Sequence, residues 1–182
     1  GCDTVEHAHW ADDATLELMI KRGTWLVPTL AVNLATSSHV RTQPDASQLT
    51  RRWAEESERV KWERLTRARA AGVRVAAGSD AGFFLTHGAD NGLEIEAFVQ
   101  GGYSTLEALT IATANGADLM GIDAGRLTKG NLADILIVDG DPLADITILR
   151  DPARLRVFKG GSEVVTPHCN YYHQSGYGPE RA

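Results

Sequence analysis

The chain has 182 residues, 43% hydrophobic and 23% charged, which is ordinary for one soluble globular domain. Its formal net charge of −6 argues against a general nucleic-acid surface. The two cysteines, Cys2 and Cys169, form no CxxC motif or disulfide framework, and no apolar run approaches the ~20 residues of a membrane span. We therefore expect a cytoplasmic protein without a membrane or nucleic-acid partner.

The first predicted strand surrounds Val5, and a helix follows it. Asp12 or Asp13 is suited to cap the start of that helix, because a short acidic side chain accepts hydrogen bonds from the first helical amides. Gly23 is placed to end the helix in the left-handed conformation. The second predicted strand spans residues 24–29.

Residues 31–45 are rich in serine, threonine, asparagine and proline, and this composition predicts a long loop. A long helix is expected over residues 47–71, followed by a third strand over residues 73–77. The helix has glutamate and arginine four residues apart, as on a solvated face rather than a nucleic-acid stripe: Glu55 with Arg59, and Glu63 with Arg67.

Two of these strands end in residues that can carry chemistry. Residues 72–82 read Gly-Val-Arg-Val-Ala-Ala-Gly-Ser-Asp-Ala-Gly, a buried parallel strand with the charge of Asp80 emerging at its carboxyl end. The first strand ends in the same way at His7. In α/β barrels the carboxyl ends of the strands hold the active site, so these two side chains are candidates for a metal-hydrolase site.

After Asp80 a polar, glycine-rich loop runs through His87 and Asn91, and a helix is expected over residues 93–99. Ser104 and Glu107 form a capping box that opens another helix. Strands and helices thus alternate through the first part of the chain. This order predicts a parallel sheet covered by helices.

The pattern changes after residue 124. Residues 133–138 predict a strand, and residues 155–159 and 163–165 predict an antiparallel hairpin around Gly160-Gly161. The last residues lack periodicity and predict a loose tail. We therefore expect three parts: residues 1–124, residues 125–166 and a tail of residues 167–182.

Four stretches resemble the C-terminal part of a metal-dependent amidohydrolase, of the subgroup that includes imidazolonepropionases and Xaa-Pro dipeptidases: residues 4–7, 72–82 and 106–121, and the glycines and Ala-Asp-Ile of residues 125–161. The resemblance implies an α/β fold. It consists of the last three βα units of a TIM-type (β/α)8 barrel, followed by a small antiparallel β segment of a composite β-sandwich.

The resemblance also implies the site. His7 would be a metal ligand, Asp80 both a metal ligand and the general base, and the cofactor a divalent metal ion, zinc in particular. His87 and Asn91 would face the substrate. His9 shares a strand face with His7 if the strand continues, so a second histidine ligand stays open. Without the family context, His7 could be a polar filler and Asp80 a helix cap.

The implied reaction is hydrolysis of carbon–nitrogen bonds in a small-molecule amide or dipeptide-like substrate, with deamination as an alternative on the same fold. The family's metal-binding histidine pair of the first strand is not in this sequence, which starts at Gly1 rather than Met. We therefore expect a fragment that lacks the N-terminal half of the barrel and is inactive alone. Its exposed strand edges predict that the chain alone forms a homo-oligomer, aggregates or has a rearranged sheet. The alternative is a non-catalytic module or half of a split assembly, and a targeting signal on a preceding segment stays open.

Overall fold

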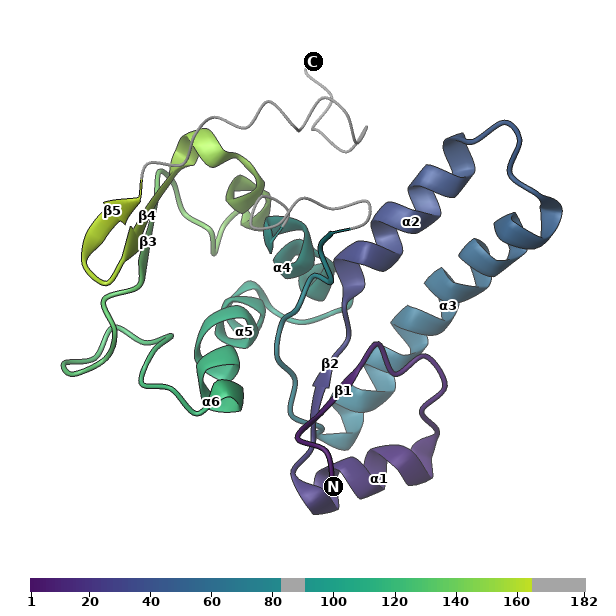
Figure 1. Cartoon of the computed structure of the whole chain (residues 1–182), viewed down its shortest axis with the longest axis horizontal. Coiled ribbons are helices and arrows are strands. Elements are labelled where there is room, and N and C mark those ends of the chain that lie inside the picture. The colour runs from purple at the N-terminus through teal and green to yellow at the C-terminus, as the bar shows by residue number, and fades with distance from the viewer. Residues whose placement is uncertain (83–90, 165–182) are drawn as a thin grey trace.

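A computed structural model describes residues 1–82 and 91–164 of the chain. Its first two strands, β1 (Thr4–Glu6) and β2 (Trp25–Val27), form a parallel sheet with Val5 opposite Leu26 (Figure 1). On the other side of β2, Leu26 forms a parallel bridge with Val75. The predicted third strand, residues 73–77, is therefore reduced to a single bridge, but β2 lies between the other two segments, as consecutive βα units require.

The helix after β1 follows its predicted caps. Helix α1 (Asp13–Arg22) begins after Asp12, whose carboxylate accepts a hydrogen bond of 2.9 Å from the amide of Thr15. It ends at Gly23, which has a φ of 69°. Leu16 and Met19 are buried, so the helix face that carries them packs on the core.

The predicted loop over residues 31–45 is wrong. Most of this segment forms a helix, α2 (Leu30–Thr42), which packs beside α3 in a long helical hairpin (Figure 1). Its serines and threonines are poor helix formers, but Ala31, Ala35 and Val40 are buried. Tertiary packing therefore overrides the local preference of the sequence.

Helix α3 (Gln48–Ala71) has nearly its predicted bounds. Ser47 caps its start by accepting from the amide of Thr50 at 3.1 Å, and Gly72 ends it with a φ of 81°. The predicted ion pairs form with different partners. Arg59 bonds to Glu56 and Glu63, and Arg67 reaches across to Asp13 of α1, so these charges also join the two helices.

Four helical segments follow: α4 (Asn91–Gln100), α5 (Thr105–Thr110), the π-helix η1 (Ile111–Asn115) and α6 (Gly116–Met120). The predicted capping box is confirmed. The hydroxyl of Ser104 accepts from the amide of Glu107 at 3.2 Å, and the Glu107 carboxylate accepts from the amide of Ser104 at 2.7 Å. Asn115 donates from its side chain to the carbonyl of Val75 at 2.8 Å, which ties the helices to the third sheet segment.

A separate antiparallel sheet ends the described chain. It has the order β3 (Ile135–Val138), β4 (Leu155–Lys159), β5 (Ser162–Val164), and the turn between β4 and β5 confirms the predicted hairpin. The short 3-10 helices η2 (Ile146–Arg150) and η3 (Pro152–Arg154) precede β4, and η2 packs on α4. The predicted tail, residues 167–182, lies outside the described residues.

The main hydrophobic core lies between the parallel sheet and the helices around it. Leu26, Leu30, Leu65 and Phe98 are each at most 2% exposed and come from β2, α2, α3 and α4. Within the described residues, no helix is both long and apolar enough to cross a membrane.

Candidate active site

The carboxyl ends of the three sheet segments bring together the two residues singled out in the sequence. His7 follows β1, Thr29 follows β2, and Asp80 follows the bridge segment of residues 73–77. We call these three residues the His7–Thr29–Asp80 edge. The Nε2 atom of His7 lies 3.8 Å from the Oδ2 atom of Asp80, and the two side chains are 44% and 54% exposed. The expectation that both lie at one end of a parallel sheet is therefore confirmed.

All three residues of the edge have left-handed backbones. The φ angles are 58° at His7, 51° at Thr29 and 51° at Asp80. A positive φ is uncommon outside glycine, and for a β-branched residue such as threonine it is a true outlier. Strained backbones of this kind concentrate at binding and catalytic sites, where the surrounding structure holds them in place.

The hydroxyl of Thr29 sets the tautomer of His7. That hydroxyl has one hydrogen and donates it to the carbonyl of Pro28 at 2.8 Å. The same oxygen lies 2.5 Å from Nδ1 of His7, so it accepts the Nδ1 hydrogen of the ring. The neutral imidazole therefore keeps its lone pair on Nε2, the nitrogen that faces Asp80.

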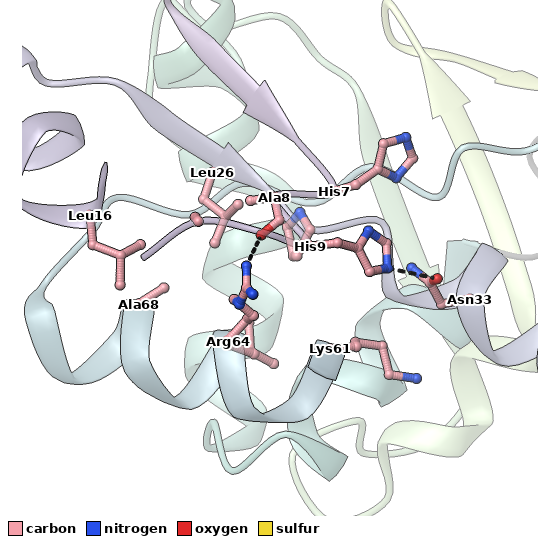
Figure 2. Close-up of a pocket in the computed structure, with 12 residues that line it drawn as sticks. His7, Ala8, His9, Leu16, Leu26, Asn33, Lys61, Arg64 and Ala68 are labelled. Atoms are coloured by element: carbon pink, nitrogen blue, oxygen red, sulfur yellow. Dashed lines mark hydrogen bonds between the residues drawn. The ribbon is translucent and has the colours of Figure 1, made fainter. Parts of the chain in front are cut away.

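His9 faces a different partner. The side-chain amide of Asn33 donates from Nδ2 to the carbonyl of Thr29 at 3.1 Å. The Oδ1 atom of Asn33 therefore accepts from Nε2 of His9, at 3.2 Å (Figure 2). Strand β1 already ends at Glu6, so His7 and His9 do not share a strand face. Burial lowers the pKa of His9, the bond to Asn33 opposes this, and nearby positive groups lower it further. His9 is therefore connected to the edge through Asn33, which bonds to the carbonyl of Thr29.

Helix α3 lies beneath the loop after β1. Arg64 donates to the carbonyl of Ala8 at 2.6 Å and holds the second left-handed residue of that loop. Lys61 is 4% exposed, and its Nζ has no hydrogen-bond partner among the described residues. Burial lowers the pKa of Lys61 to about 8. Between these side chains and His9 is a cavity of about 10 Å³, enough for one water molecule (Figure 2).

Glu94 of α4 is the other buried ionisable group. It is 2% exposed, and its Oε2 accepts from the amide of Ala31 at 2.6 Å. Burial raises the pKa of Glu94 to about 7, while the amides of Ala31, Leu30 and Gly78 and the charge of Lys61 act in the opposite direction. Its other oxygen, Oε1, is buried and has no hydrogen-bond partner among the described residues.

Sequence reasoning missed four supporting groups: the Thr29 hydroxyl, Asn33, Lys61 and Glu94. A usable signal exists for the last two. Glu94 lies on the same helix face as the buried Ala97 and Phe98, and Lys61 on the same face as Leu65. A charge inside an apolar helical stripe indicates a buried polar contact.

Two predicted substrate-facing residues have different outcomes. His87 lies outside the described residues. Asn91 was expected in a loop but is the first residue of α4 and is exposed. The helix therefore begins earlier than the apolar pattern from Leu93 indicated.

The donor set of the edge fits part of a zinc site. Ligands of one zinc ion each lie ~2.0–2.2 Å from it, so two of them are separated by less than about 4.4 Å. The 3.8 Å between His7 Nε2 and Asp80 Oδ2 is within that limit, and the other ring nitrogen of His7 is already bonded to Thr29. Among residues 1–82 and 91–164, however, no group of three or more histidine, cysteine or acidic side chains is arranged to hold a metal ion.

Comparison with known proteins places the chain in a family. The chain matches the amidohydrolase family over residues 1–164. It is 31% identical over 169 residues to ochratoxinase from Aspergillus niger, covering 88% of this chain and 33% of that protein. A solved Xaa-Pro dipeptidase with bound methionine in its active site superposes with a TM-score of 0.79 at 29% identity, covering 90% of this chain and 40% of the other. The chain therefore belongs to the amidohydrolase family.

A third relative is a prolidase complexed with N-methylphosphonate-L-proline. It superposes with a TM-score of 0.73 at 30% identity, over 90% of this chain and 40% of the other. The α/β fold and the resemblance to prolidase-like amidohydrolases are thus confirmed. The chain spans between a third and two fifths of the length of these three proteins.

Proposed function

We propose that the protein containing this chain is a metal-dependent hydrolase of carbon–nitrogen bonds in small amides, and that the His7–Thr29–Asp80 edge belongs to its active site. The observation that supports this most directly is the approach of His7 Nε2 to Asp80 Oδ2, 3.8 Å, with the other nitrogen of His7 bonded to Thr29. A paired imidazole and carboxylate, half-exposed at strand ends, is the arrangement that such chemistry needs.

Both side chains would hold the metal ion, and Asp80 would also act as the general base. A bound divalent metal ion supplies a more acidic water and polarises the substrate carbonyl. His7 would hold the ion through Nε2, because the hydroxyl of Thr29 accepts the hydrogen of Nδ1. Asp80 accepts a proton from the attacking water and delivers it to the leaving nitrogen.

The substrate class follows from the relatives. The likeness to two solved structures, an Xaa-Pro dipeptidase and a prolidase, supports an amide or dipeptide-like substrate. His87 and Asn91 follow Asp80 in the chain, and we propose that this segment contacts the part of the substrate beyond the scissile bond.

A catalytic zinc site generally has three protein ligands, and the edge supplies two. We propose that the remaining ligands come from residues outside those described. The 182-residue chain alone should then bind zinc weakly and hydrolyse amides at no appreciable rate. The protein encoded by the whole open reading frame that contains this chain, called below the full-length protein, should do both.

The experiment compares the two proteins after purification in zinc-containing medium. Zinc content is measured by elemental analysis, and hydrolysis is followed on Xaa-Pro dipeptides and N-acyl amino acids. Zinc-dependent turnover by the full-length protein supports the proposal. Zinc binding without hydrolysis of any amide would overturn the reaction, and stoichiometric zinc with turnover in the 182-residue chain would overturn the ligand count.

A further inference from the structure

Glu94 is a buried carboxyl group with no part in the chemistry proposed above. It lies on α4, is 2% exposed, and accepts from the amide of Ala31 at 2.6 Å. Placing an ionisable group in a hydrophobic core costs free energy unless its hydrogen bonds repay the loss of water. Its contacts therefore indicate what this side chain does.

The first contact is with the start of α2. A helix begins with backbone amides that have no partner inside the helix, and the N-cap side chain usually satisfies one of them. Here the N-cap residue is Thr29, which is left-handed and makes no side-chain cap bond. Its hydroxyl is already bonded to His7 and Pro28. The carboxylate of Glu94 takes over as the cap from another helix.

The other carboxyl oxygen of Glu94, Oε1, has no hydrogen-bond partner among the described residues. The amide of Gly78, in the segment that leads to Asp80, is one of the groups that favour the ionised form and lower the pKa of Glu94 against the effect of burial. Gly78 also packs closely on β2, because a Cβ atom at this position would lie 2.6 Å from Cγ1 of Val27. Glu94 is thus bonded to the chain after Thr29 and electrostatically linked to the chain before Asp80.

We propose that Glu94 is a positioning residue that holds the ends of β2 and of the Asp80 segment in register, and thereby sets the tautomer of His7 and its separation from Asp80. The inference rests on the proposed function only for its effect on metal binding and turnover. Its structural part concerns the His7 ring and holds whatever the substrate is.

Three variants of the full-length protein test this. Glu94→Gln keeps the size and one acceptor oxygen, Glu94→Leu keeps the size without an acceptor, and Glu94→Asp withdraws the carboxylate by one methylene. The matched control is Glu96→Leu on the same helix. It breaks the ion pair between Glu96 and Arg150, 2.9 Å, which involves no residue of the edge.

The main readout is the pair of ¹⁵N chemical shifts of the His7 ring, measured in metal-free protein labelled at histidine and assigned with His7→Gln. We expect the Nδ1–H tautomer in the parent protein, in Glu94→Gln and in Glu96→Leu. Glu94→Leu should give a tautomer mixture, with Glu94→Asp between the two. Zinc affinity should fall about 10- to 100-fold in Glu94→Leu and recover in Glu94→Gln.

Unchanged His7 shifts in folded Glu94→Leu would overturn the proposal, as would an equal change in Glu96→Leu. If Glu94→Leu does not fold, Glu94→Asp decides, and unchanged His7 shifts and zinc affinity in that variant overturn it. Failure of the parent protein to hydrolyse amides would count against the proposed function alone, because the His7 shifts are read without metal or substrate.

Discussion

The Nδ1 atom of His7 lies 2.5 Å from the hydroxyl oxygen of Thr29, and that hydroxyl is itself oriented by its donation to Pro28. The ring of a metal-binding histidine needs such a partner on its second nitrogen, because the partner holds the ring orientation and the tautomer. Thr29 therefore acts on the proposed metal site without touching the metal.

Replacing Thr29 by valine tests this role. Valine is also β-branched, so the strain at a φ of 51° is retained while the hydroxyl is lost. We expect zinc affinity of the full-length protein to fall about 10- to 100-fold. Competition with a zinc chelator measures it, and Thr29→Ser, which keeps the hydroxyl, should stay close to the parent. Equal affinities of Thr29→Val and the parent would contradict the prediction.

Asp80→Asn should separate catalysis from folding. Asparagine tolerates the left-handed conformation that Asp80 adopts, and the side chain is 54% exposed, so the free energy of unfolding should change by less than about 0.5 kcal/mol. Loss of the general base should lower kcat about 100- to 10,000-fold. Steady-state kinetics measures kcat, and elemental analysis in parallel measures the zinc content of the variant. A variant with full zinc and near-parental kcat would remove Asp80 from the role of base.

Gly78→Ala should destabilise the protein through one contact. The new methyl group would lie 2.6 Å from Cγ1 of Val27, which forces the bridge segment away from β2. We expect a loss of about 1–3 kcal/mol in the free energy of unfolding, partly restored by adding Val27→Ala. The control is Gly116→Ala, since a Cβ at Gly116 meets nothing within 4 Å. Urea denaturation of the parent, Gly78→Ala, the double variant with Val27→Ala, and Gly116→Ala measures the free energy of unfolding. An equal free energy of unfolding for Gly78→Ala and the parent would refute the contact.

The stability of the protein should depend on pH through Glu94. Burial raises the pKa of Glu94 from 4.5 to about 7, so between these values the folded state binds more protons than the unfolded state. Stability therefore falls as pH rises through this range, by up to about 3 kcal/mol. Glu94→Gln should remove this slope, and Glu96→Gln should keep it. Denaturation midpoints at pH 4.5 to 7.5 test the difference, and parallel slopes for Glu94→Gln and the parent would disprove it.

Several helix ends and the two strand ends that carry His7 and Asp80 were predictable because their signals are local. Asp12 and Gly23 bound one helix, Ser104 and Glu107 open another, and apolar runs ending in His7 and Asp80 predict two strand ends. Family resemblance then indicated which of these polar residues share a site. The 3.8 Å separation of His7 and Asp80 agrees with that prediction.

The parts that were missed depend on contacts between distant segments. Helix α2 was expected to be a loop because its own sequence offers no cap and few strong helix formers. The cap comes from Glu94, 63 residues further along the chain, and the remaining stabilisation comes from packing on α3. The sequence of α2 alone indicates neither the cap from Glu94 nor the packing on α3. The roles of Asn33 and of the Thr29 hydroxyl were missed for the same reason.

The left-handed backbones of the edge have a consequence for engineering. Glycine adopts such a φ without the steric cost, roughly 1–2 kcal/mol per residue, that side chains incur there. A redesign that optimises folding free energy alone would therefore favour glycine at His7, Thr29 and Asp80, where φ lies between 51° and 58°. Heat resistance gained in this way would remove the candidate ligand, its partner and the candidate base together, so a thermostabilised form has to be sought with these three positions held constant.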